Sequence, residues 1–215
     1  MFEQVAALAP DNARGLSNLG ASYVSQGHYA DGIPVLERSI AIRRSGGAFS
    51  NLGNAYFYLR RYDDAARAYK QAVELRQTDF RLWRNLGDGY NWSSGKRDLA
   101  TDAYRRAISV AREQLLVNPK DADALGIVAV CQAMLGDKQL PFESLSKSLQ
   151  LNPDDPEMFY RAALVHNRFG DSAQAMVWLK KAVSGNISAQ MIRDTPDFDN
   201  LRSESGFKEL LGAKQ

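Results

Sequence analysis

The chain has 215 residues, 45% of them hydrophobic, and its 27 basic and 25 acidic residues give a net charge of +2. So small a charge excludes the large one-sign field that drives bulk nucleic-acid binding. A single cysteine excludes an intramolecular disulfide, and neither Cys-x-x-Cys metal spacing nor an apolar run of about 20 residues, enough to span a bilayer, is present. We therefore expect a folded cytoplasmic protein with no cofactor or metal and no nucleic-acid or membrane partner.

Residues 1–12 resemble a segment found later in the chain. Phe2, Val5 and Leu8 precede Pro-Asp-Asn in the same way that 145–151 precede Pro-Asp-Asp. This spacing predicts the last turns of a helix that closes a repeat. Residues 1–12 are then either an N-terminal capping helix or a partial repeat, the start of a piece cut from a longer array.

Five helical hairpins are predicted from a Leu-Gly pair that recurs at a fixed distance. The pair stands at Leu19-Gly20, Leu52-Gly53 and Leu86-Gly87, so the glycines are 33 and 34 residues apart. A period near 34 residues is typical of a stack of helical hairpins. The later chain keeps this period with weaker identities. Within 13–186 the hairpins are expected at 13–45, 46–79, 80–120, 121–155 and 156–186.

Each repeat also alternates small and large residues. In the third repeat the small Ala100 and Ala107 flank the bulky Tyr104, and Trp83 and Tyr90 flank the Leu-Gly pair. Small residues let two antiparallel helices approach closely, and large ones fill the spaces between them. Over residues 1–185 the pattern resembles the tetratricopeptide repeat (TPR) family. That resemblance implies an all-α, right-handed α-solenoid of about five hairpins with terminal capping helices.

The third hairpin departs from the pattern. Its turn, 91–95, carries one extra residue, and its second helix runs about seven residues longer before 118–119. Seven residues make two turns, or about 10 Å of helix. Because Ile108, Ala111 and Leu115 continue the apolar stripe, we expect the extension to pack on the next repeat or to meet a partner.

The 34-residue pattern stops after residue 186, and 187–215 are expected to form short capping helices. Their apolar residues fall into two sets, Phe198 and Leu201, then Phe207, Leu210 and Leu211. The last hairpin of a solenoid needs a cap with a polar outer side. Together with the repeats, this tail also resembles the C-terminal arrays of some bacterial multidomain signalling proteins, in which the array follows a kinase, cyclase or winged-helix effector domain.

The chain is not expected to be an enzyme, because its reactive side chains form no catalytic set. His28 falls in a turn and is expected in solvent, whereas His166 takes the position of the earlier tyrosines and is expected to be packed and hydrogen-bonded. Cys131 takes a small interior position, which predicts a buried, inert thiol.

A better candidate for function is the face formed by the first helices of the repeats. The resemblance implies that these helices line the concave side of the array. Residues three and seven positions apart on a helix project together, because 3.6 residues make one turn. That register gives Asn18, Ala21 and Ser25; Asn51, Asn54 and Tyr58; Asn85, Asp88 and Trp92; Ile127, Val130 and Met134; and Arg161, Leu164 and Arg168.

Three asparagines occupy the same level of successive first helices. Asn18, Asn51 and Asn85 can grip the backbone of an extended peptide, because a primary amide both donates and accepts hydrogen bonds. The row resembles the asparagine ladders of some peptide-binding TPR superhelices. The alternative is that asparagine before Leu-Gly serves the fold, since it is common across the family without a known ligand.

The arginines of the same helices leave two interpretations open. The carboxylate clamp, by which some TPR domains hold chaperone C-terminal tails, needs lysine, asparagine and arginine at set positions. In the first window here only Asn51 and a basic Arg81 match, so chaperone binding is not expected. Arg81, Arg84, Arg161 and Arg168 are predicted either to meet an acidic ligand or to lie on a solvated surface.

The sequence therefore predicts a scaffold that binds a protein or an extended peptide, with Tyr58 and Trp92 as aromatic anchors. One alternative is a regulatory segment of a larger bacterial signalling enzyme of the kinase or cyclase type. Another is a self-assembling module, a homo-oligomer formed through the solenoid ends.

Overall fold

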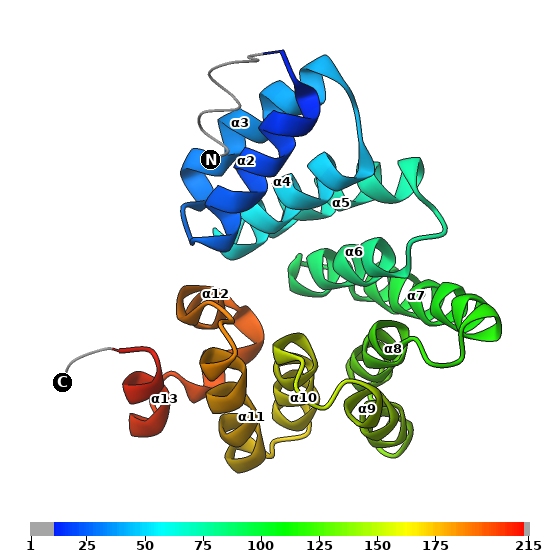
Figure 1. The fold of residues 1–215 in the computed structure, drawn as a ribbon, viewed down its shortest axis with the longest axis vertical. Coiled ribbons are helices and arrows are strands. Elements are labelled where there is room, and N and C mark those ends of the chain that lie inside the picture. Colours follow the sequence, from blue (N-terminus) through cyan, green and yellow to red (C-terminus); the bar gives the residue numbers. More distant parts are fainter. Residues whose placement is uncertain (1–10, 213–215) are drawn as a thin grey trace. The chain divides into compact units, whose positions relative to one another are not determined.

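The computed structural model describes residues 11–212, and throughout that part the chain folds into helices joined by turns, with no strand (Figure 1). The helix predicted from Phe2, Val5 and Leu8 lies outside the described residues.

Ten of the helices in 11–212 follow one another as five pairs. They are α2 (Ala13–Ser25) with α3 (Tyr29–Ile42), α4 (Gly46–Tyr58) with α5 (Tyr62–Leu75), α6 (Phe80–Trp92) with α7 (Arg97–Val117), α8 (Ala122–Met134) with α9 (Leu140–Leu151), and α10 (Pro156–Arg168) with α11 (Ser172–Ser184). Helix α2 packs on α3, α4 on α5, α8 on α9 and α10 on α11. The predicted all-α solenoid of consecutive hairpins is therefore confirmed.

Each first helix of a pair begins after a residue whose side chain accepts a hydrogen bond from a backbone N–H of the first turn. These N-cap residues are Asn12, Ser45, Asp79, Asp121 and Asp155. Such a cap satisfies a helical donor that has no other partner, and its loss typically costs about 1 kcal/mol. The same kind of residue therefore starts every repeat.

The glycines of the Leu-Gly pairs lie where the second helix crosses the first. Leu36 of α3 is buried directly against Gly20, and Tyr69 of α5 against Gly53. A Cβ atom added to Gly53 would lie 2.5 Å from Cδ1 of the Tyr69 ring. The small-against-large alternation in the sequence thus corresponds to direct contacts within a hairpin.

The chain divides into two compact units, Met1–Ala103 and Tyr104–Gln215. In the first unit, α2 contacts α4 and α4 contacts α6, while α3 and α5 pack on the first helix of the next pair. Successive first helices therefore adjoin one another within this unit, and side chains in equivalent register come to neighbouring positions.

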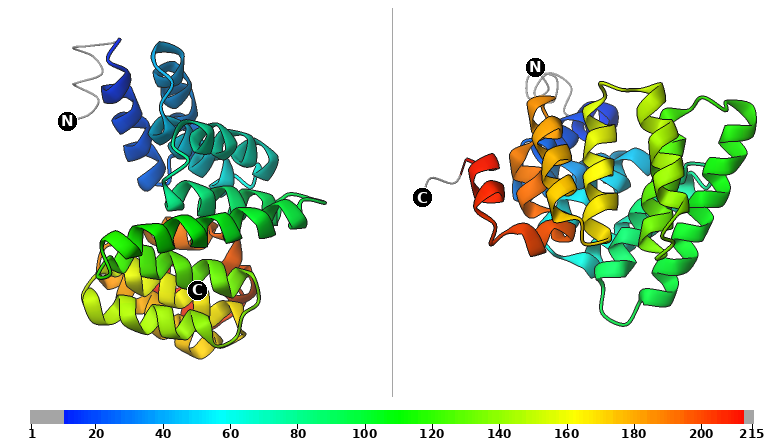
Figure 2. Two further views of the ribbon diagram at one scale, coloured as in Figure 1. Left: turned by 90° about the vertical axis from the view of Figure 1, so that its right-hand side faces the viewer. Right: turned by 90° about the horizontal axis from the view of Figure 1, so that it is seen from below.

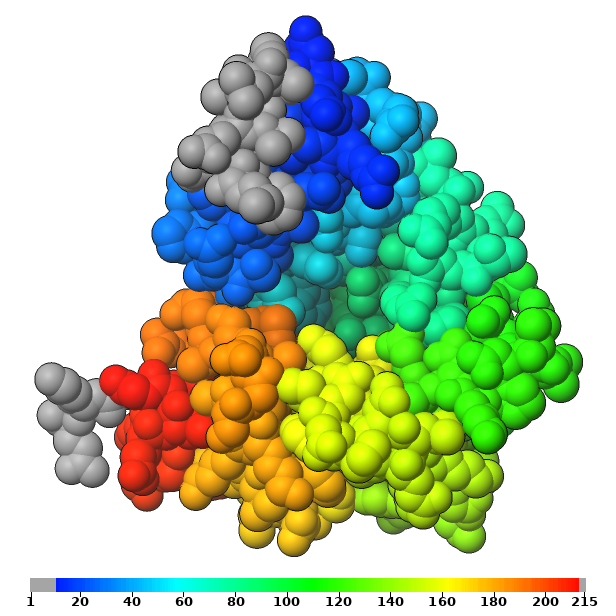
Figure 3. All heavy atoms as spheres, in the orientation of Figure 1, coloured from blue at the N-terminus to red at the C-terminus, as the bar shows by residue number. Residues whose placement is uncertain are grey.

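In the second unit, α8, α9, α10 and α11 stack side by side (Figure 2). Three short helices follow: α12 (Ala189–Asp194), the 3₁₀ helix η1 (Pro196–Leu201) and α13 (Ser205–Leu210). Phe198, Leu201 and Phe207 are buried in one core with residues of α10 and α11. Figure 3 shows the red C-terminal atoms seated against the orange helices before them.

Helix α7 is 21 residues long, whereas α3 and α5 each have 14. Ala111 in the added length is buried, and Leu115 is half-buried. The last two residues differ, because Leu116 and Val117 are 85% and 84% exposed. The extension packs along part of its length and leaves an apolar end in solvent.

Candidate functional site

The asparagines of the predicted face, the ladder residues Asn18, Asn51 and Asn85 together with Asn54, divide into two kinds. Asn18 on α2 is exposed and Asn51 on α4 is half-buried, and within residues 11–212 neither side chain makes a hydrogen bond. By contrast, Asn54 Oδ1 accepts a hydrogen bond from the Tyr69 hydroxyl at 2.8 Å, and Asn85 Nδ2 donates to Ser50 Oγ at 3.4 Å. Asn54 and Asn85 thus tie helices together.

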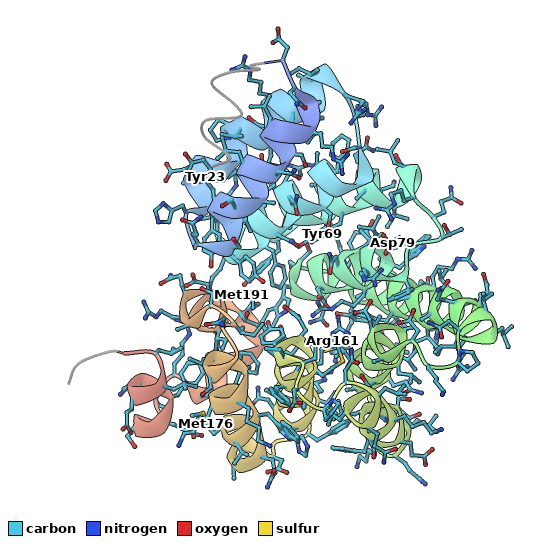
Figure 4. The ribbon with its side chains drawn as sticks, viewed as in Figure 1. Tyr23, Tyr69, Asp79, Arg161, Met176 and Met191 are labelled. Atoms are coloured by element: carbon cyan, nitrogen blue, oxygen red, sulfur yellow. The ribbon has the colours of Figure 1, made fainter. Side chains whose placement is uncertain are left out.

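The Tyr69 hydroxyl is fixed in the protonated state. Burial raises the pKa of Tyr69 well above its usual value, because the charged phenolate is disfavoured away from water. The hydroxyl of Tyr69, which Figure 4 labels, therefore has a proton to donate, and its hydrogen bond holds the side-chain oxygen of Asn54 toward α5.

Each of the two asparagines that make no internal hydrogen bond has a small, partly exposed residue near it on its own helix. Ala21 lies one turn from Asn18, and Ser50 precedes Asn51; both are partly exposed. We call Asn18, Ala21, Ser50 and Asn51 the amide face. Because α2 and α4 contact each other, this face presents two amides on adjacent helices with no bulky side chain among its four residues.

On α6 the predicted contact residues pair with neighbours. Arg84 Nε lies 2.8 Å from Asp88 Oδ2, and Asp88 is only 8% exposed. Arg81 lies 4.6 Å from the centre of the Phe80 ring and forms a 3.8 Å ion pair with Asp79. Arg84 is thus paired within α6, whereas Arg81 shares Asp79 with Arg76, which lies 3.0 Å from the same carboxylate.

In the second unit the predicted arginines bind the neighbouring helix. Arg161 of α10 contacts Asp123 of α8 through Oδ1 at 2.5 Å and through the backbone carbonyl at 3.1 Å (Figure 4). Arg168 donates to the carbonyls of Ala133 and Met134, both at 3.4 Å, at the C-terminal end of α8. A cation there also offsets the negative end of the helix dipole.

The apolar residues predicted for this part of the face offer little surface. Ile127 is 3% exposed, and Val130 and Leu164 are also buried. Met134 is half-buried and packs against the core of the second unit. Of these four side chains, Met134 alone keeps partial exposure to solvent.

The two predicted aromatic anchors belong to a row of rings in the first unit. Tyr58 stacks on Tyr29 with ring centres 5.0 Å apart, and Trp92 packs on Tyr62 at 5.9 Å. Phe57 lies between these pairs, 5.8 Å from Tyr58 and 5.6 Å from Tyr62. The row links three successive repeats, and both anchors are half-buried.

The other reactive side chains lie as the sequence indicated. His28 is exposed in a turn, while His166 lies 3.2 Å from Asp171 and packs edge-on against Phe142. Cys131 is buried and forms no disulfide. In the described part of the chain, no three His, Cys, Asp or Glu side chains are grouped to hold a metal, and none of the helices there has the length and apolarity to cross a membrane.

The partners of these residues do not follow from the apolar pattern of the repeats. Asp123, which binds Arg161, lies 38 positions earlier, and Ser50 lies 35 positions from Asn85. Both separations in sequence are close to the length of one repeat. A search for polar residues about one repeat apart would therefore identify these pairs.

Two family models, both described as tetratricopeptide repeat, match the chain over residues 13–45 and 47–79. A thermophilic TPR protein of Thermus thermophilus superposes with a TM-score of 0.62 at 20% identity, over 86% of this chain and 98% of that one. PilF of Pseudomonas aeruginosa superposes with a TM-score of 0.55 at 15% identity, over 95% and 99% of the two chains. These two likenesses show the fold alone.

Among curated proteins, the BBSome complex member BBS4 of Bos taurus is 23% identical over 202 residues. The match covers 94% of this chain but 36% of the bovine protein, so the chain spans about a third of that relative's length.

Proposed function

This chain is a tetratricopeptide repeat protein, and we propose that it is a protein-interaction scaffold whose amide face binds an extended segment of a partner. The fold suggests the general role, since stacked helical repeats present an extended surface suited to binding other proteins. The bovine relative, by its name, belongs to a multiprotein complex, which agrees with a scaffold role.

The proposal rests on the side-chain amides of Asn18 and Asn51, which make no hydrogen bond within residues 11–212. Both amides keep their donor and acceptor capacity, because neither is used inside the described structure. Packed helices lie about 8–10 Å apart, and an extended chain rises about 3.3 Å per residue. Two amides on adjacent first helices are therefore spaced to bind peptide groups about three residues apart.

The remaining residues of the predicted face have a supporting role in this proposal. They pair with neighbouring side chains, tie one helix to another or pack between helices, and any contact they make with a ligand is secondary. They are Asn54, Tyr58, Arg81, Arg84, Asn85, Asp88, Trp92, Ile127, Met134, Arg161 and Arg168. A free-standing adaptor and a regulatory segment of a larger signalling protein would use the same amide face.

Two double variants test the proposal: one removes the amides of the amide face, and the other is its matched control. A peptide selected from a random library on the intact protein serves as the probe, and its affinity is measured by calorimetry. Asn18→Ala with Asn51→Ala should weaken binding by about 0.5–1.5 kcal/mol per hydrogen bond lost. Its stability should change by no more than about 0.5 kcal/mol, as is usual for surface sites.

The matched control is Asn54→Ala with Asn85→Ala, which removes amides of the same kind one turn or one repeat away. We expect this variant to lose stability, because it leaves the buried Tyr69 hydroxyl without its partner. Peptide affinity of the folded fraction should persist. Unchanged affinity in the Asn18 and Asn51 variant, or a stability loss above about 2 kcal/mol there, would refute the amide face.

A further inference from the structure

A groove of about 810 Å³ runs along the C-terminal half of α7, within the second unit. Its apolar lining comes from Ile108 and Leu116 of α7 and from Leu135 and Leu140 at the turn between α8 and α9. The α7 residues that line it, from Arg105 to Leu116, cover eleven steps of helix, or about 16 Å at 1.5 Å per residue. The groove is thus long enough to hold about three turns of another helix.

The same helix also carries the most exposed apolar side chains of the described residues. Leu116 and Val117 are 85% and 84% exposed, and the next large apolar residue, Leu99, is 50% exposed. One patch therefore holds both a hollow with an apolar lining and an apolar projection beside it. A surface of that kind can bury its projection in the hollow of an identical surface.

The charges in the groove distinguish between possible occupants. Arg105 and Arg112 line it together with Glu113 and Asp137, so the two signs are equal in number. A strongly acidic or strongly basic ligand would meet like charge on one side of the groove. An isologous contact places a patch against itself, and it is favourable when that patch carries both signs.

Along α7, Arg112 and Glu113 lie between Ile108, which lines the groove, and the exposed Leu116 and Val117. Arg112 is exposed and makes no ion pair with any residue that the structure describes. If two copies of α7 lie antiparallel with Arg112 of one opposite Glu113 of the other, the two-fold axis repeats that ion pair. In the same antiparallel register, Ile108 of one copy, four residues before Arg112, lies opposite Val117 of the other copy, four residues after Glu113.

We propose that the chain forms a two-fold homodimer through this groove, with the α7 helices antiparallel. Leu116 and Val117 of each copy are buried against the groove of the other, and Arg112 pairs with Glu113 across the axis. This interface lies along the side of α7. It therefore differs from a stacking of solenoid ends, and it is independent of peptide binding at the amide face.

Light scattering coupled to size-exclusion chromatography, run on the intact chain over a wide range of concentration, gives the first test. The wild-type protein should show a concentration-dependent dimer mass. Leu116→Asp removes two buried leucines per dimer, so the dissociation constant should rise by about 100-fold or more. Leu99→Asp, on the same helix but outside the groove lining, is the control and should leave the dimer intact.

A charge exchange tests the register. Arg112→Glu alone and Glu113→Arg alone each place like charges opposite each other twice, so each variant should dimerise more weakly than the wild type. An equimolar mixture of the two variants restores opposite charges and should form a heterodimer tighter than either homodimer. Circular dichroism checks that all variants stay folded.

Three results would overturn the proposal. A wild-type monomer at every concentration would assign the groove to a different protein. A dimer that survives Leu116→Asp would place the contact elsewhere, for example at the solenoid ends. A mixture no tighter than its components would refute the antiparallel pairing of Arg112 with Glu113.

Discussion

Arg60 holds the backbone position that glycine fills in other short turns of this chain. Its φ is +59°, while Gly27, Gly136 and Gly170 have φ between 80° and 84° in the corresponding turns. The left-handed conformation costs an L-residue roughly 1–2 kcal/mol, and glycine avoids that cost at some loss of chain entropy. The second hairpin therefore carries local strain at its turn.

Arg60→Gly should accordingly stabilise the protein by about 0.5–1 kcal/mol. The Arg60 side chain is exposed, and its hydrogen bond to the Tyr62 hydroxyl is long, at 3.4 Å. Urea unfolding followed by circular dichroism measures the change. Gly170→Arg is the reverse control and should destabilise by a similar amount; if Arg60→Gly destabilised instead, the strain argument would be wrong.

A second pair of substitutions separates helix propensity from packing. In Gly53→Ala the new Cβ would meet the buried Tyr69 ring at 2.5 Å, and such overpacking costs about 1–3 kcal/mol. In Gly47→Ala, on the same helix, the Cβ would meet nothing within 4 Å, and alanine should stabilise by up to about 1 kcal/mol. Opposite signs in thermal melts are expected, and equal effects would contradict the close crossing.

The sequence predicts the packing of those residues whose position recurs in each repeat. Gly53, His166 and Cys131 each occupy a position that recurs in other repeats, so the packing of the equivalent residues predicts their own. The arginines were not predictable in this way. Arg161 was expected at a ligand or in solvent, but it binds Asp123, and that pairing depends on how two helices sit in space.

The C-terminal segment is the element whose packing the apolar pattern described best. Phe198 is buried against Tyr160 with ring centres 5.9 Å apart, and the Tyr160 hydroxyl lies 3.0 Å from Thr195 Oγ1. Phe207 of α13 joins the same core. The short helices thus cover apolar surface that α10 and α11 would otherwise expose.

Phe198→Ala should therefore destabilise the protein by about 3–5 kcal/mol, the usual range for a buried phenylalanine. Lys208→Ala, on the exposed side of α13, should change stability by no more than about 0.5 kcal/mol. Deleting 187–215 should lower the melting temperature or cause aggregation. A truncated chain that stays monomeric with an unchanged melt would show that the segment is not a cap.

For helix α7, the sequence predicts the length of the helix but not the elements against which it packs. The length of its extension followed from the distance between the turn glycine, Gly95, and the proline after the helix, Pro119. What the extension packs against did not follow, because periodicity identifies an apolar face but not its neighbour. Ala111 is buried while Leu116 stays in solvent, and that difference depends on where α8 and α9 lie.

At the scale of the whole molecule, the chief helix contacts inside each unit join elements that are close in sequence. Helices pack on their hairpin partners and on the adjacent repeat, and the boundary between the two compact units falls within α7, after Ala103. The stability of such a repeat array is a sum of repeat and nearest-neighbour terms. Unfolding of one region therefore need not carry the other with it, and a two-state description is not guaranteed.

Hydrogen exchange with mass spectrometry tests this independence with two variants already described. Gly53→Ala should lower the protection of α4 and α5 while leaving α10 and α11 close to wild type, and Phe198→Ala should do the reverse. The physical reason is that each substitution disturbs contacts within one unit only, so the free energy of local opening changes there first. Arg60→Gly provides a check of sign, because it should raise protection in α4 and α5. Equal loss of protection along 11–212 in either destabilised variant would show that the chain unfolds as a single cooperative unit.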